Sequence, residues 1–327
     1  MIDEFAARYG MFPAGAKVLC AVSGGADSMC LLHWLYTNAQ RLEITVCAAH
    51  FEHGLRGEES LRDRDFVRGW CSERDIEFYT ESGDVNSFAT ENSLSTEEAA
   101  RILRYNFLQA ALERSGSDII ATAHNLEDNA ETVLLNLTRG TGIKGLAGIP
   151  PVRDRIVRPL LGTGRAEIEE YDRENNVPYI TDSSNLSDDY SRNKIRHAVI
   201  PTLRDINSGF GANILRMGEL LRAEDGYMDT LADGFISEYY DGDSLPLKEI
   251  KKLDPAVSAR VIRKLCPKTL SRVHVDAIQK LCIGTELAFA DVPGARIRRQ
   301  KGRLYFTDPP VEKRLKKKNK NIKDIED

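Results

Sequence analysis

Short apolar runs alternate with amphipathic segments along the first half of the chain. The apolar runs have the length of strands and cover residues 17–22, 43–50, 77–80 and 118–123. The segments with apolar residues at helical spacing cover residues 29–35, 60–74, 95–112 and 126–137. Strands that alternate with helices predict an α/β domain with a mostly parallel sheet and helices on both of its faces.

The second half of the chain has a different pattern. We expect an edge strand at residues 156–161 that Pro159 ends, a helix to about residue 175, and a long helix from 207 to about 240. Two short helices (254–265 and 271–283) and two strand-like pieces (286–290 and 296–306) follow. We therefore predict a catalytic domain over residues 1–210 and a smaller, mostly helical domain with a small β element over 211–310. Residues 311–327 form a Lys-rich tail that we expect to be disordered.

The first apolar run ends in Ser23-Gly24-Gly25-Ala26-Asp27-Ser28, directly before a helical pattern. Glycine permits a tight turn and lets a ligand approach the backbone closely. The N–H groups of the turn and of the helix N-terminus then form an anion site, to which the two serine hydroxyls add donors. Because Asp27 would repel a phosphate, its presence predicts a bridging Mg²⁺.

Polar residues also follow two other predicted strands, at His50 and His124. In parallel sheets ligands bind beyond the carboxyl ends of the strands. After His124, the carboxylates of Glu127, Asp128 and Glu131 share one side of a predicted helix with it. This group suits Mg²⁺ coordination, proton removal or capture of a cationic substrate. Alternatively, acidic residues simply favour a helix N-terminus, which explains Glu131 least well.

Three further segments are ambiguous. His50 and His53 have HxxH spacing, which favours nucleotide binding or substrate positioning over a metal site, and His53 is alternatively structural. Glu97 and Arg101 are spaced as a helical ion pair, but the same helix could present Arg101 and Arg104 to phosphate. The Gly-rich segment 139–148, with Lys144, is either a mobile anion-binding loop or a plain connector.

Composition narrows the class of protein. The chain of 327 residues is 42% hydrophobic and 29% charged, without an apolar run long enough for a membrane span or a signal peptide, so we expect a cytoplasmic protein. The six cysteines include no CxxC pair, which disfavours disulfide, zinc and iron–sulfur sites.

The charged residues are unevenly distributed along the chain. Residues 248–327 carry 21 Lys and Arg against 10 Asp and Glu, whereas the remainder carries 24 against 40. A basic C-terminal part on an acidic body favours an anionic partner.

The ordered motifs SGGADS, HFEHGLRGEES, EEAARILRY, ATAHNLEDNAETVLLNLTRGTGIKGLAGI, RPLL and SRNKIRH resemble those of the tRNA(Ile)-lysidine synthetases, which belong to the PP-loop ATP pyrophosphatases. The resemblance covers about residues 17–200, and with it we predict that the smaller domain at residues 211–310 binds tRNA. It implies a ligase that uses ATP to adenylate C2 of the wobble cytidine in the CAU anticodon of tRNA(Ile). The L-lysine amine then displaces AMP, giving lysidine and changing the codon specificity from Met to Ile.

The resemblance also implies roles for individual residues. It implies ATP binding by Ser23, Gly24, Gly25, Ala26, Asp27 and Ser28, and catalysis by Asp27, His124, Asp128 and Glu131. It implies Mg²⁺ binding by Asp27 and Asp128. It implies substrate or tRNA contacts by His53, Arg56, Arg101, Arg104, Lys144, Arg192, Asn193 and Arg196. The family usually reads His-His-x-Asp-Asp-Gln where this chain has Asn125, Glu127 and Asn129.

Other functions stay open at this point. A tRNA thiolase on the same ATP domain would need catalytic or cluster-binding cysteines, and an ammonia-using synthetase gives no reason for a basic C-terminal part. A non-catalytic tRNA-binding protein would not need the intact SGGADS turn and the carboxylates. The sequence does not fix the oligomeric state, and a homodimer is compatible with it.

Overall fold

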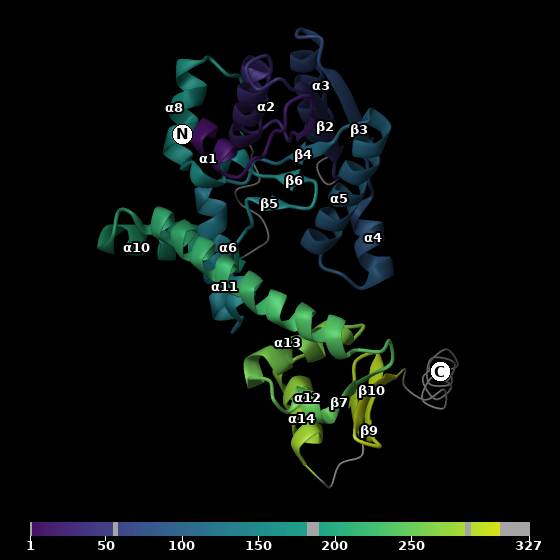
Figure 1. Cartoon of the computed structure of the whole chain (residues 1–327). Helices are drawn as coiled ribbons and strands as arrows, with labels where there is room; N and C mark the ends of the chain where they lie inside the picture. The colour runs from purple at the N-terminus through teal and green to yellow at the C-terminus, as the bar shows by residue number, and fades with distance from the viewer. Residues whose placement is uncertain (1, 55–57, 182–189, 285–288, 308–327) are drawn as a thin grey trace, which may run out of the picture. The chain divides into compact units, whose positions relative to one another are not determined.

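Two units make up the chain, Met1–Leu221 and Arg222–Asp327 (Figure 1). The computed structural model describes residues 2–54, 58–181, 190–284 and 289–307. Within these ranges, no helix combines the length and the apolar character that crossing a membrane requires. The assignment of catalysis to residues 1–210 and of tRNA binding to residues 211–310 stays a prediction.

A six-stranded sheet lies at the centre of the first unit, in the order β3-β2-β1-β4-β6-β5. The strands are β1 (Lys17–Ala21), β2 (Thr45–Glu52), β3 (Glu77–Ser82), β4 (Ile119–Ala121), β5 (Val152–Arg153) and β6 (Ile156–Val157). All neighbouring pairs are parallel except β5 with β6. The predicted α/β fold with a mostly parallel sheet is confirmed.

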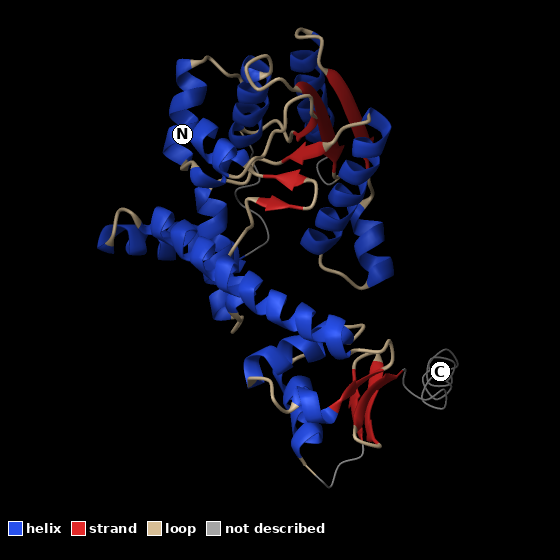
Figure 2. Ribbon diagram, viewed as in Figure 1, coloured by secondary structure: helices blue, strands red, loops and turns tan. Residues whose placement is uncertain are grey.

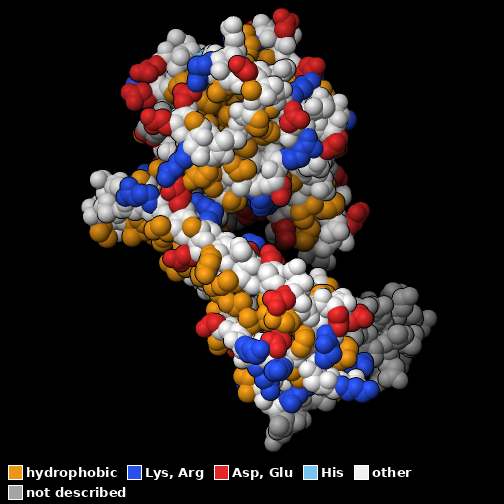
Figure 3. All heavy atoms as spheres, in the orientation of Figure 1, with side chains coloured by type: hydrophobic (Ala, Val, Ile, Leu, Met, Phe, Trp, Pro, Cys, Tyr) orange, Lys and Arg blue, Asp and Glu red, His pale blue; other side chains and the backbone are white. Residues whose placement is uncertain are grey.

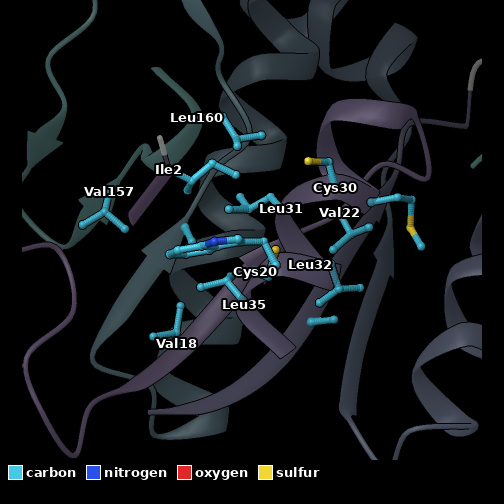
Figure 4. Close-up of a cluster of buried hydrophobic side chains, with 14 of the residues drawn as sticks. Ile2, Val18, Cys20, Val22, Cys30, Leu31, Leu32, Leu35, Val157 and Leu160 are labelled. Atoms are coloured by element: carbon cyan, nitrogen blue, oxygen red, sulfur yellow. The ribbon is translucent and has the colours of Figure 1, made fainter. Parts of the chain in front are cut away.

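Helices cover both faces of this sheet, with α2 (Ala26–Asn38), α3 (Glu58–Ser72) and α5 (Thr96–Ser115) packed directly on its strands (Figure 2). The other helices of the first unit are α1 (Ile2–Arg8), α4 (Val85–Asn92), α6 (Leu126–Thr138), α7 (Ile143–Leu146), α8 (Arg165–Glu174), α9 (Tyr190–Lys194), α10 (Ile200–Ile206) and the first part of α11 (Phe210–Tyr239). Successive strand residues alternate between the faces. Val18 and Cys20 of β1 pack with Leu31 and other residues of α2 (Figure 4), whereas Leu19 joins the cluster that α5 covers.

Two local predictions differ from the structure. Residues 156–161 are not an edge strand, because β5 pairs with β6 on its outer side and takes the edge. Pro159 ends the strand as expected, but it also starts a 3₁₀ turn, Pro159–Gly162. Helix α4 was not predicted, because its polar sequence lacks a strong apolar period and it packs on α5 through little more than Val85 and Ala89.

The second unit has its own core. An antiparallel sheet in the order β7-β10-β9-β8 packs with helices around Val261, Ile278, Ile297 and Leu304. Its elements are β7 (Ser244–Pro246), α12 (Leu247–Ile250), α13 (Pro255–Leu265), α14 (Arg272–Ile283), β8 (Phe289–Val292), β9 (Ala295–Gln300) and β10 (Arg303–Thr307). The predicted strand 296–306 is thus two strands that turn at Lys301 and Gly302, both with positive φ. Part of the predicted piece 286–290 and the tail 311–327 lie outside the described residues.

The strand order of the first unit places the candidate site. The chain runs outward from β1 through β2 to β3 and then returns to the other side of β1 as β4. Ligands of parallel sheets bind at such a point of reversal, beyond the carboxyl ends of the strands. The segments that start at Ser23 and at His124 leave the sheet there, because they follow the neighbouring strands β1 and β4.

Candidate active site

The turn between β1 and α2 is held by one buried hydroxyl. Ser28 Oγ accepts hydrogen bonds from the backbone N–H groups of Ser23 (3.1 Å) and Gly24 (3.2 Å), and it donates to the carbonyl of Gly25 at 2.9 Å. Gly24 has a φ of +98°, which a residue with a side chain rarely adopts. The Ser28 hydroxyl therefore shapes the turn. Because its proton goes to Gly25, the Ser23 hydroxyl donates to Ser28 Oγ at 3.1 Å, and this leaves the first N–H groups of α2 as the donors for an anion.

Asp27 lies in the first turn of α2. Its Oδ2 is 3.3 Å from Nη1 of Arg165 on α8, while its Oδ1 is buried without a hydrogen-bond partner among the described residues. Burial raises the pKa of Asp27, and Arg165 opposes this shift. A buried carboxylate oxygen without a partner fits a cation ligand.

Asp128 is the second candidate metal ligand. It forms a capping box with Asn125: the Asp128 N–H donates to Asn125 Oδ1 (3.0 Å), and the Asn125 N–H donates to Asp128 Oδ2 (3.1 Å). Burial, followed by the neighbouring carboxylates of Glu131 and Asp27, raises the pKa of Asp128 to about 6. The described residues include no group of three or more His, Cys, Asp or Glu placed for a metal. Two protein carboxylates suit Mg²⁺, which usually takes its other ligands from phosphates and water.

Glu131 is fully buried on α6 and is bound by arginines from a distant segment. Arg196 donates to both of its carboxylate oxygens, at 2.5 and 3.0 Å, and Nε of Arg192 lies 3.5 Å away. Arg192 also pairs with Glu97 of α5 at 2.9 Å. Among the described residues, Glu97 therefore pairs with this distant arginine and not with Arg101, as its helical spacing had suggested. Arg196 lies in a π-helical turn, Ile195–Val199, a distortion that is frequent at functional sites.

His124 is neutral at physiological pH. Burial and four neighbouring arginines lower its pKa to about 3. Its Nδ1 is 3.0 Å from the hydroxyl of Thr122. The arginines are Arg104, Arg158, Arg101 and Arg192, in order of decreasing effect. His124 can therefore donate or accept a hydrogen bond in this cationic surrounding, but it does not hold a second proton.

The structure thus brings several of the predicted residues together. Asp27, Asp128, Glu131 and Arg196 interact with one another, and Arg101, Arg104 and Arg192 surround His124. Other predicted residues lie in different settings. The ring of His53 packs edge-on against Phe51, Lys144 is exposed on α7, Asn193 is on α9, and Arg56 lies outside the described residues.

Two other predictions can be placed. One ring nitrogen of the buried His50 is 2.9 Å from the carbonyl oxygen of Val22, so His50 links β2 to the segment that leads into the turn. The Gly-rich segment is tied to the site by Asn129, whose Oδ1 accepts from the N–H of Ile149 at 2.8 Å. A Cβ at Gly148 would come within 2.3 Å of the same oxygen, so glycine is needed there.

The sequence reasoning missed two arginines of this region. Arg165, which pairs with Asp27, gave no signal, because their spacing along the chain is unrelated to any helical period. Arg158 had one: it is a charged residue inside the apolar run 156–161, and the structure buries it with 2% of its surface exposed.

Comparisons with known proteins agree with this geometry. The family model described as PP-loop domain matches residues 2–203. The tRNA(Ile)-lysidine synthase of Geobacillus kaustophilus is 34% identical over 327 residues, covering 94% of this chain and 70% of the relative. The chain belongs to the tRNA(Ile)-lysidine synthase family. The resemblance seen in the sequence motifs is therefore confirmed.

Two further comparisons set the limits of this assignment. The tRNA(Ile)-lysidine synthases of Clostridium acetobutylicum and Clostridium tetani are 36% and 35% identical, and the chain spans 60% and 64% of their lengths. A U34-tRNA thiolase NcsA from Methanococcus maripaludis, solved with its [4Fe-4S] cluster, has a TM-score of 0.58 at 20% identity and covers 68% of this chain and 80% of its own. This likeness concerns the fold alone. In this member of the lysidine synthase family, all six cysteines are buried.

Proposed function

We propose that this protein joins L-lysine to C2 of the wobble cytidine of a tRNA(Ile) with a CAU anticodon, using ATP. The observation that carries the proposal is the arrangement at the ends of β1 and β4. An anion-binding turn and the unpartnered Oδ1 of Asp27 meet the carboxylates of Asp128 and Glu131. The names of the relatives supply the substrates.

In the first step, ATP binds at the turn from Ser23 to Ser28. The cytidine O2 attacks the α-phosphorus of ATP, an O–P bond forms, and pyrophosphate leaves. Asp27 and Asp128 would hold a Mg²⁺ ion, which when bound neutralises phosphate charge. Arg165 keeps Asp27 in place from the side through their 3.3 Å contact.

In the second step, the lysine amine attacks C2 of the adenylated cytidine. A C–N bond forms, the C–O bond to AMP breaks, and the nitrogen loses a proton. Only the neutral amine has a lone pair, so a nearby base must accept a proton. Asp128 suits this role when it is not bound to Mg²⁺, because its raised pKa of about 6 then lies closer to neutrality than that of an exposed carboxylate. Glu131 is already engaged by Arg196.

The second unit is the candidate for tRNA binding. Figure 3 shows Lys and Arg side chains gathered on the visible face of this unit, in agreement with the excess of basic residues after position 247. Basic groups that neutralise backbone phosphates give affinity without sequence recognition. We also propose a cytoplasmic location and a homodimer, and both rest on the sequence alone.

The variant Asp27→Ala tests the adenylation step. With α-labelled ATP, lysine and a CAU tRNA transcript, we expect AMP formation to fall by about a hundredfold or more, since a transition-state contact is removed. Retention of tRNA on a filter should stay close to wild type. Asp65→Ala, which removes an exposed carboxylate on α3, is the matched control and should change neither. Normal AMP formation by Asp27→Ala would contradict the proposed role.

A further inference from the structure

An arginine that the proposed chemistry does not use is buried beside the site. Arg158 directly follows β6 and has 2% of its surface exposed. Its Nη1 donates to the carbonyl of Pro150 at 2.7 Å, but its Nε is buried and has no hydrogen-bond partner among the described residues. A buried guanidinium normally has all of its donors satisfied, so this free donor needs an explanation.

Two side chains of α5, Arg104 and Tyr105, share this buried environment with Arg158. The Nε of Arg104 and the hydroxyl of Tyr105 are also buried. The guanidinium groups of Arg104 and Arg158 can only donate toward the Tyr105 oxygen, so its own O–H has no acceptor among the described residues. The guanidinium carbons of Arg101 and Arg104 lie 5.2 and 5.4 Å from the centre of the Tyr105 ring. Burial would raise the pKa of Tyr105, but Arg104, Arg101 and Arg158 outweigh burial and lower it. These groups therefore share one strongly positive environment.

Among the described residues, no carboxylate pairs directly with these cations, and Asp128 exerts only a small opposing effect, on Arg104. Across residues 2–54, 58–181, 190–284 and 289–307, Arg101, Arg104 and Arg158 form no ion pair. Burial lowers the pKa of both Arg104 and Arg158, as expected for cations removed from water without compensation. Such groups are costly in a folded protein unless an anion meets them. His124, on which these arginines act, is neutral.

We propose that Arg104, Tyr105 and Arg158 form a subsite for a phosphate group, with the two free Nε–H groups and the phenol as donors to its oxygens. Guanidinium groups are well suited to phosphate because they present several N–H donors in one plane. The identity of the anion rests on the proposed function, which offers two sources. It is either the pyrophosphate part of ATP or a phosphodiester beside the target cytidine in the tRNA.

Equilibrium binding to the full chain tests the subsite, with inorganic pyrophosphate and an anticodon stem–loop RNA as separate probes. We expect Arg158→Gln to weaken binding of one of the two probes by about tenfold or more, since a charge-assisted contact is lost. If the RNA is the affected probe, the slope of log affinity against log salt should also fall by about 1. Arg173→Gln removes an exposed cation of α8 and is the matched control.

Tyr105→Phe keeps the test decisive if Arg158→Gln does not fold, because it removes a single oxygen and leaves the ring. It should weaken the same probe by about threefold to tenfold, the effect of one hydrogen bond. The subsite is refuted if the folded variants bind both probes within about twofold of wild type. In that event, AMP formation by the wild-type protein would leave the proposed function intact. If the wild-type protein forms no AMP either, both the subsite and the proposed function are refuted.

Discussion

Replacing Asp172 with asparagine should make the first unit more stable above pH 7. Asp172 lies on α8 with 2% of its surface exposed. Among the described residues, no N–H or hydroxyl donates to its carboxylate oxygens, and only the Cys30 thiol interacts weakly with them. Burial, and then the negative charge of Asp27, raises its pKa from 3.8 to about 7. The folded protein therefore holds a carboxyl group that resists ionisation.

The size of the effect follows from this shift. A raised pKa means that the folded state binds more protons than the unfolded state between about pH 4 and pH 7, so stability falls as the pH rises through this range. A shift of about 3 units corresponds to about 4 kcal/mol at and above pH 7, as an upper limit. The buried amide of asparagine costs about 1–3 kcal/mol in turn. We expect Asp172→Asn to gain about 2 kcal/mol at pH 8. At pH 4.5 the ionisation penalty is only about 1 kcal/mol, so the variant should instead lose about 1 kcal/mol.

Urea unfolding followed by tryptophan fluorescence measures this difference. The chain has two tryptophans, Trp34 and Trp70, and both belong to the core of the first unit, so the signal reports on that unit. Glu170→Gln, at an exposed position of the same helix, is the control and should be neutral at both pH values. A stability difference for Asp172→Asn that is the same at pH 4.5 and pH 8 would refute the reasoning, as would a loss at pH 8.

Three other changes test the site itself. Ser28→Ala removes the hydroxyl that binds two N–H groups and one carbonyl of the turn, and should weaken ATP binding in a calorimetric titration by about tenfold. Because the pKa of Asp128 is raised to about 6, the lysine-transfer rate should fall about tenfold per pH unit below pH 6, and a flat profile down to pH 5 would exclude Asp128 as the base. Glu131→Gln weakens the pair with Arg196 and should lower the unfolding free energy by about 1–3 kcal/mol; an unchanged urea midpoint would contradict this.

The parts of the fold that local signals specify were predictable. The apolar run before Ser23 and the glycines after it predicted the strand, turn and helix around the anion site. Ser95 was expected to cap the long helix, and its hydroxyl does accept a hydrogen bond from the N–H of Glu98 at 3.2 Å. The spacing of Asp128 and Glu131 placed two carboxylates on one side of α6, which begins just after His124. In each case the interacting residues are neighbours in sequence.

The remainder depends on contacts between distant segments. Glu97 pairs with Arg192, 95 positions away, although Arg101 is available one helical turn along. The pair of Asp27 with Arg165 spans 138 positions. Whether Arg158 in an apolar run points outward or inward depends on what covers β6, which no local pattern encodes. These contacts define the charges around the site, so the charge environment of the site could not be predicted from the sequence alone.

Transfer of labelled lysine to tRNA tests the central proposal most directly. The protein would be incubated with ATP, Mg²⁺, labelled L-lysine and a tRNA(Ile) transcript with a CAU anticodon. The account predicts acid-precipitable label that depends on ATP and disappears when the wobble cytidine is changed to uridine. No label, with AMP still released in the presence of the CAU transcript, would mean that lysine is not the nucleophile and would contradict the account.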